Sequence, residues 1–162
     1  MQTPKQSAGN VIAIPVAATT NIEAGTIVCV DGSTKLAKPG ADTAGLIAFG
    51  VAEHNAVNAA GGAGAIPVAV NRRVTTLANS EEDPVAQADL GNIVYVEDAS
   101  TISKTGGDHQ VIAGILTAIS ADGSDVDVDF SATPLLTAVA AQIAAAIAAF
   151  QTVADGRYAA HA

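Results

Sequence analysis

Aromatic residues are scarce in this chain, which has no tryptophan, three phenylalanines and two tyrosines among its 162 residues. Alanine and valine supply most of the hydrophobic content, which is 49% of the residues. A core of such small side chains makes many small contacts, whereas ligand pockets usually have large apolar or aromatic walls. The scarcity of aromatics therefore favours thin β-layers and close helix packing over a deep ligand pocket.

A single cysteine, Cys29, excludes an intrachain disulfide. It lies in an apolar run without a histidine or a second cysteine nearby in the sequence, so we interpret it as a small buried hydrophobic residue. The first residues are polar and lack the apolar stretch of a signal peptide, which predicts synthesis in the cytoplasm.

Basic residues are also few: seven Lys and Arg stand against sixteen Asp and Glu, for a net charge of −9. Residues 1–80 carry five bases and four acids, whereas residues 81–130 carry one base and eleven acids. An acidic chain repels phosphate backbones, so we expect no nucleic-acid partner. The asymmetry predicts a molecule with two electrically different surfaces.

Convincing helical periodicity is absent before residue 131, where short runs rich in valine and isoleucine alternate with turn residues. This pattern predicts that residues 1–131 form a β-domain, folded as a small β-barrel or sandwich. Pro15 and Pro67 interrupt their runs, which predicts edge strands or bulges there. The expected strands are Val11–Ala17, Thr26–Val30, Leu46–Glu53, Ile66–Val70, Arg73–Leu77, Asn92–Glu97, Val111–Ile119 and Asp125–Phe130.

The β-domain contains an internal repeat. The segment Gly25–Asp31 aligns with Gly91–Glu97, and after a two-residue slip Gly50-Val51 matches Gly114-Ile115. We therefore expect two repeated β-motifs, at about residues 22–54 and 88–119, with chance similarity between hairpins as the alternative. A copy of this length cannot cover its own apolar face, so the two copies should pack on each other.

The composition changes abruptly near residue 131. Thr133 is a candidate helix N-cap, Pro134 suits the first helical position, and the following residues are uncharged as far as Asp155-Gly156, where the glycine suits a C-cap. We therefore predict that residues 132–162 form one alanine-rich C-terminal α-helix and a tail.

The larger side chains of this helix recur at spacings of three and four, which indicates a heptad seam. A helix with so little charge must be covered, by a bilayer, by its own β-domain or by other copies of the chain. Alanine is weakly hydrophobic and no basic cluster flanks the helix, so we expect no membrane partner. The predicted oligomer interface comprises Leu136, Val139, Ile143, Ala146, Phe150 and Val153.

Patterns that could carry chemistry lack the partners they need. Asp125–Asp129 alternates aspartate with valine, which places the carboxylates on one solvated strand face rather than around a calcium ion. The glycine-rich segment 60–65 is followed by no phosphate-binding lysine or helix, so we expect a hairpin loop. The three histidines, His54, His109 and His161, lie far apart in the sequence. No catalytic, cofactor or metal site is predicted, and the chain is interpreted as a non-enzymatic structural protein.

Arg72 and Arg73 are the only adjacent pair of basic residues in the chain. One interpretation is that they serve solubility. The other is that they dock the neutral N-terminal half onto an acidic partner, which makes them candidate contacts to a larger assembly.

Six segments follow one another in an order typical of a known protein family. They are Ile22–Val28, Phe49–Ala52, Ile66–Val70, Gly91–Val96, Ile112–Ile115 and Asp125–Phe130. Their order resembles that of the capsid cement, or head decoration, proteins of tailed bacteriophages. The resemblance covers roughly residues 10–130, and the alanine-rich helix departs from the shorter family pattern.

The resemblance implies a compact β-domain that binds the major capsid protein on the outer face of the virion, often as a homotrimer, and strengthens the shell. It implies no catalytic residue. We expect the nearly neutral residues 1–80 to meet the capsid and the acidic residues 81–130 to face solvent. Two other functions stay open, namely the base or adaptor of a phage fibre or spike, and a small β-barrel enzyme or carrier.

Overall fold

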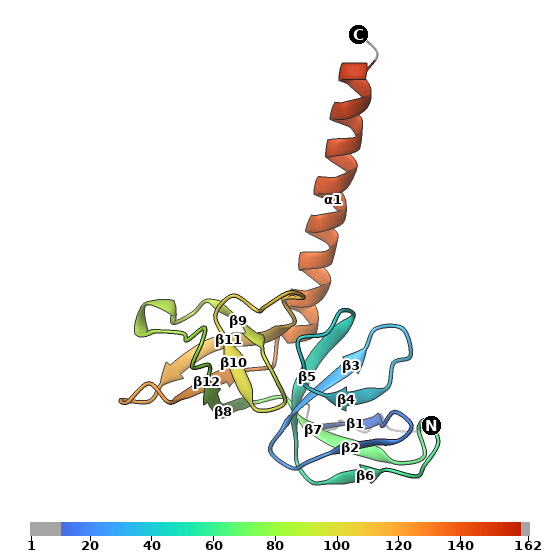
Figure 1. Cartoon of the computed structure of the whole chain (residues 1–162), viewed down its shortest axis with the longest axis vertical. Helices are drawn as coiled ribbons and strands as arrows, with labels where there is room; N and C mark the ends of the chain where they lie inside the picture. Colours follow the sequence, from blue (N-terminus) through green and yellow to red (C-terminus); the bar gives the residue numbers. More distant parts are fainter. Residues whose placement is uncertain (1–10, 160–162) are drawn as a thin grey trace, which may run out of the picture.

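The structure, a computed structural model, describes residues 11–159, with side chains described for residues 11–152. It consists of a five-stranded sheet whose edges are joined by a single bridge, an adjoining closed barrel, and one long helix that rises from the region where they meet (Figure 1). The expected fold class, mainly β with a barrel, an internal repeat and one C-terminal α-helix, is confirmed.

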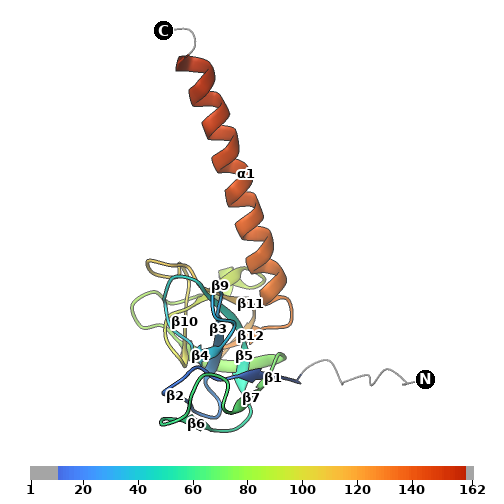
Figure 2. The same ribbon diagram turned by 90° about the vertical axis from the view of Figure 1, so that its right-hand side faces the viewer.

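The first barrel, barrel 1, has five strands in the order β1-β7-β5-β3-β4. A single parallel bridge between Val16 and Ala37 joins its two edges. A separate two-stranded antiparallel sheet, β2 (Thr20–Ile22) with β6 (Ala56–Asn58), is formed from its connections and lies at the end of the molecule farthest from the helix tip (Figures 1 and 2). The barrel strands are β1 Val11–Pro15, β3 Ile27–Asp31, β4 Ala37–Pro39, β5 Leu46–Ala52 and β7 Pro67–Asn71.

The second barrel, barrel 2, is closed, in the order β10-β8-β12-β11-β9. A short 3-10 helix, η1 (Gln87–Asp89), lies in the connection between its first two strands. The strands are β8 Val74–Asn79, β9 Ile93–Val96, β10 Thr101–Ser103, β11 Ile112–Ile119 and β12 Asp125–Asp129.

The two barrels have the same topology. In each, the first strand along the chain pairs with the fifth, the fifth with the fourth, the fourth with the second and the second with the third. The parallel pairing of β8 with β10 corresponds to the bridge between Val16 and Ala37. The repeat therefore extends beyond the two predicted motifs to whole barrels, because the outer strand pairs β1–β7 and β8–β12 also correspond.

The matched glycines lie at the same place in both barrels. Val28 pairs with Gly50 and Val94 pairs with Gly114, and a β-bulge follows at the same position of each pair. A Cβ at Gly50 would collide with the carbonyl oxygen of Asn71, and a Cβ at Gly114 would collide with that of Asp129. Glycine is therefore required at both sites because the neighbouring strand approaches too closely for any side chain.

All eight expected strands are present, with ends shifted by no more than two residues. The strands that the sequence did not predict, β2, β4, β6 and β10, have three residues each, which is too short for an alternating pattern. The expectation that Pro67 marks an edge or bulge is wrong. Its strand, β7, lies between β1 and β5, and Pro67 is tolerated there as the first residue of the strand.

Both faces of β3 are buried. Val28 and Val30 belong to the core of barrel 1, while Ile27 and Cys29 join the core that fills barrel 2. Burial on both faces explains why this segment is continuously apolar instead of alternating. It also confirms the interpretation of Cys29 as a buried hydrophobic residue, and burial raises the pKa of its thiol to about 12.

Helix α1 extends over Thr133–Ala159. The hydroxyl of Thr133 is fully buried and donates to the carbonyl of Ala113 in β11 at 2.6 Å, so this side chain ties the helix base to barrel 2. The predicted end at Gly156 is wrong because the helix continues for three further residues. A glycine inside a helix costs only about 1 kcal/mol relative to alanine, and Arg157, Tyr158 and Ala159 can continue it.

Candidate functional site

The projecting part of α1 is the most unusual surface of the molecule. Every residue from Ala138 to Thr152 is exposed, and the helix stands clear of both barrels in two views (Figures 1 and 2). Ile143 is 55% exposed and Phe150 is 77% exposed, which is uncommon for large apolar side chains. Such a surface indicates an interaction site.

The predicted seam residues follow the heptad spacing along this helix. Leu136 is half-buried at the base, while Val139, Ile143, Ala146 and Phe150 are exposed. The sixth, Val153, lies outside the residues whose side chains are described.

Sequence reasoning missed two exposed apolar residues of the same helix, Leu135 and Ile147. Ile147 lies four residues after Ile143, a spacing that places both on one helix face and that could have identified it.

Docking of the helix on its own β-domain is limited to its base. Its main contacts are with β5 and β11, and every residue from Ala138 to Thr152 is exposed. The segment Thr133–Thr152 is long and apolar enough to cross a membrane by length and composition, with a mean hydropathy of 1.8. The two arrangements that cover the helix from outside, a bilayer and other copies of the chain, therefore both stay open on geometry.

The structure separates the roles of the two adjacent arginines. Arg72 is half-buried, and its Nη2 donates to the carbonyl of Ser131 at 2.7 Å, next to the base of α1. Arg73 is exposed, and its side chain makes no ion pair among the described residues. Arg72 therefore has an internal structural role, and Arg73 is the better candidate for contact with another molecule.

Hydrogen bonds between Asp42 and the segment Asp108-His109 join the two barrels, and we call this contact the clasp. The sequence did not predict it. The carboxylate of Asp42 accepts hydrogen bonds from the backbone N–H groups of Asp108, at 2.8 Å, and His109, at 3.0 Å. The ring Nδ1 of His109 lies 3.6 Å from the same carboxylate. Asp42 and Asp108 occupy matching positions in the repeat, but nothing in the sequence indicates that they meet.

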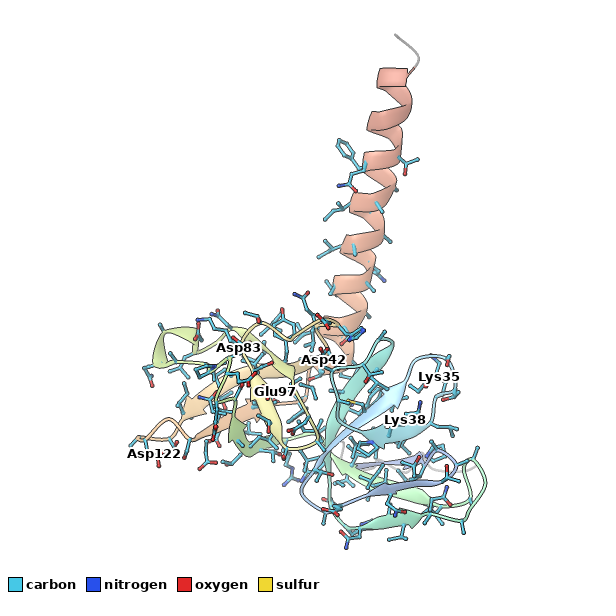
Figure 3. The ribbon with its side chains drawn as sticks, in the orientation of Figure 1. Lys35, Lys38, Asp42, Asp83, Glu97 and Asp122 are labelled. Carbon is cyan, nitrogen blue, oxygen red and sulfur yellow. The ribbon has the colours of Figure 1, made fainter. Side chains whose placement is uncertain are left out.

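Carboxylates gather beside this clasp. Figure 3 labels Asp42, Asp83 and Glu97, and together with Glu82 they line a cavity of about 270 Å³. Asp83 accepts hydrogen bonds from the backbone and the hydroxyl of Thr105, so it has a structural role there. Within the described residues, no group of three or more His, Cys, Asp or Glu is arranged to hold a metal ion.

A second cavity, of about 400 Å³, lies where the helix base meets both barrels. Its walls are mainly apolar, and His109 is its only titratable lining residue. The lining residues are Gly32, Gly45, Leu46, Ile47, His109, Gln110, Val111, Ile112, Thr137 and Ala140.

Three turns use an aspartate in the same way. Asp31, Asp98 and Asp122 each accept a hydrogen bond from the backbone N–H of the serine two residues later. Lys38 lowers the pKa of Asp31 most, and the hydroxyl of Ser120 contributes most to lowering that of Asp122 to about 2. Burial raises the pKa of Asp98, but hydrogen bonds from Ser100 and Thr101 outweigh it and lower the pKa overall. These carboxylates hold the turns in shape.

Of the two patterns in which no site was expected, one has the predicted form and the other has it only in part. In β12 the valines Val126 and Val128 are buried, whereas the aspartates of Asp125–Asp129 lie on the outer face. The glycine-rich segment 60–65 is a loop between β6 and β7, but the predicted hairpin is wrong, because β6 pairs with β2 whereas β7 pairs with β1 and β5.

Comparison of the chain with family models, with curated proteins and with solved structures finds no match.

Proposed function

We propose that this chain is a structural virion protein that binds the outer surface of a phage capsid and stabilises the shell as a homotrimer. The observation that carries the proposal is the projecting helix, whose apolar side chains have no cover within the described part of the chain. A subunit with this helix needs a partner, and a bundle of identical helices supplies one.

The distribution of side chains on α1 favours a bundle over a bilayer. Val139, Ile143, Ile147 and Phe150 share one side of the helix by their spacing, and alanine occupies most other positions. Such a stripe fits a seam between helices. A lipid-facing helix needs apolar side chains on all sides, and alanine contributes little to insertion. Burying each of these larger side chains stabilises the bundle by about 1.5–3 kcal/mol.

The capsid as partner rests on the resemblance to cement proteins, whose segment order spans residues 10–130. The duplicated barrel is compatible with this role, because many weak repeated contacts across a lattice sum to a large stabilisation. The β2–β6 sheet beside barrel 1 lies opposite the helix tip, so we expect this end to face the capsid and the helix to point outward (Figure 1). The acidic barrel 2 would then help to keep particles apart.

Self-association through the helix is tested by light scattering of the purified full chain. The double variant Ile143→Glu/Ile147→Glu should convert trimers to monomers, because it places charges in the seam. The control Ala145→Glu, on the opposite side of the helix, should leave the mass unchanged. A parent chain that is monomeric at micromolar concentration would contradict the proposal.

Capsid binding is tested by co-sedimentation with capsids and by electron microscopy of particles with and without the protein. Density on the outer shell and greater resistance of the shell to heat are the expected results. Arg73→Glu should weaken binding at low ionic strength, while Arg72 is left intact because it supports the helix base. Co-purification with a fibre instead of the shell would favour the alternative, a fibre or spike base protein.

A further inference from the structure

One row of side chains on barrel 1 supplies part of its contact with barrel 2. The row crosses four strands through the paired positions Val11, Asn71, Val51 and Ile27. Ile27 is fully buried and Val51 is 5% exposed, and both belong to the core that fills barrel 2. Through Ile27 and Val51, this outer row is therefore part of the surface with which barrel 1 covers barrel 2.

Among the described residues, no second barrel lies beside the corresponding row on barrel 2. Pairing across β8, β12, β11 and β9 places Val74, Asp129, Ile115 and Ile93 side by side, in positions that match the first row one by one. Val74 is 51% exposed, Ile93 is 37% exposed and Ile115 is half-buried. Three of the four positions are thus apolar in both barrels, and two of these, Ile27 and Val51, are buried in barrel 1, whereas their counterparts Ile93 and Ile115 are not.

An exposed outer face does not require apolar residues at these positions. On the same face of barrel 2, Asp125 and Asp127 are polar and alternate with the buried Val126 and Val128. Single apolar residues are ordinary on protein surfaces, but here three of the four positions in one cross-strand row are Val or Ile. The row repeats a surface that barrel 1 uses for packing.

We propose that the Val74–Ile115–Ile93 row of barrel 2 is a subunit contact that receives barrel 1 of a second copy of the chain. The contact would be heterologous, because different surfaces of the two copies meet, and such contacts close into rings where the rotation allows it. Barrels 1 and 2 then alternate around the assembly. This inference uses the proposed self-association but does not depend on binding to a capsid.

The contact inside the chain indicates which part of the second copy lies at this row. The backbone N–H of Ile27 donates to the carbonyl of Ala99, in the turn between β9 and β10, at 2.7 Å. The matching turn of barrel 1 lies between β3 and β4 and contains Thr34, which is exposed. Ile93 of one copy should therefore lie near Thr34 of the next.

Cysteine cross-linking tests this arrangement. The full-length double variant Ile93→Cys/Thr34→Cys, treated with a short bismaleimide cross-linker, should give covalent dimers and trimers on a denaturing gel. The parent chain should give none, because Cys29 is fully buried. The matched control Val57→Cys/Thr34→Cys, with Val57 66% exposed on the β2–β6 sheet, should give at least tenfold less product. Circular dichroism of each variant checks that it folds.

The outcomes separate this contact from the helical bundle. Cross-linked dimers and trimers that exceed the control support the barrel contact. Absence of cross-links in a chain that light scattering shows to be trimeric overturns the barrel contact and leaves the bundle. A link within one chain, which gives no increase in mass, also overturns it. A monomeric parent chain overturns both this contact and the proposed trimer.

Discussion

Barrel 1 and barrel 2 have the same strand order, the same bulge and the same obligatory glycines, yet they differ in what surrounds them. Barrel 1 buries both its interior and the outer face of β3, whereas the matching strand β9 of barrel 2 buries only its inner face. Small residues, Cys29 and Ala48, pair on the covered face, and Tyr95 and Ile112 replace them on the open one. The copies therefore share the residues that set the barrel and differ in those that meet a neighbour.

Barrel 1 and barrel 2 also differ in charge. Residues 11–71 hold four acidic and two basic residues, while residues 74–129 hold eleven acidic residues and one basic residue. This difference shows that the same strand topology can form with very different surface charges, because surface charge affects solubility and partners rather than the fold.

The largest expected effect tests whether the glycine requirement is common to both barrels. Gly50→Ala and Gly114→Ala should each lower the free energy of unfolding by about 3 kcal/mol, because the new methyl group collides with a neighbouring backbone carbonyl. Gly50→Ala should cost more, since Gly50 also has a φ of +149°. Urea unfolding followed by circular dichroism measures both effects.

Gly62→Ala is the control for these variants. A Cβ at Gly62 would meet no atom within 4 Å, so its stability should stay within about 0.5 kcal/mol of the parent. A large loss in only one of the two barrels would show that the repeated glycines do not have the same role.

The second prediction tests the difference in burial between Ile27 of barrel 1 and Ile93 at the matching position of barrel 2. Ile27→Ala should lower stability by about 3 kcal/mol, as expected for a fully buried isoleucine. Ile93→Ala, at the matching position of barrel 2, should cost about 1 kcal/mol in the dissociated subunit, because its side chain is already partly exposed. Unfolding is best compared in the background Ile143→Glu/Ile147→Glu, which separates the subunits. Equal losses would remove the distinction between the covered and the open row.

The smallest effect concerns the matching turns at Asp31 and Asp98. Both carboxylates have lowered pKa values, so they stabilise the turns above about pH 4, the usual value for aspartate, and this contribution is lost as the pH falls through the native pKa. Only Asp31 has a lysine partner, Lys38, at 2.8 Å.

Lys38→Met should therefore raise the pKa of Asp31 and leave that of Asp98 unchanged. NMR titration of the side-chain carboxyl carbons measures both values in one sample. An unchanged pKa at Asp31 would show that the serine and backbone hydrogen bonds of the turn are sufficient to lower it.

Much of the fold was predictable because it depends on local pattern. Runs such as Leu46–Ala52 and Ile112–Ile119 are long enough to show strand character, and the uncharged segment after Thr133 could only be a helix. The strands of three residues were not predictable, since their formation depends on the neighbours with which they pair. The end of α1 was misplaced because a glycine weakens a helix without necessarily stopping it.

The candidate site was likewise predictable only in part. The heptad spacing identified Val139, Ile143 and Phe150 as apolar positions on one helix, and the structure shows that they are exposed. The adjacent arginines looked equivalent in the sequence, but only the fold brings Arg72 to the carbonyl of Ser131, 59 residues along the chain.

The sequence by itself determined that the chain is mainly β, that a glycine-marked strand motif occurs twice, and that an uncharged helix follows. These features depend on periodicity and composition, which are local. Only the tertiary structure decided that each copy belongs to a five-stranded unit of the same topology, that Asp42 joins the two units, and that Ile27 and Val51 are buried while Ile93 and Ile115 are not. These features depend on which distant surfaces are in contact. Similar apolar residues stand at matching positions of both copies, so their order in the sequence does not show which of them are buried.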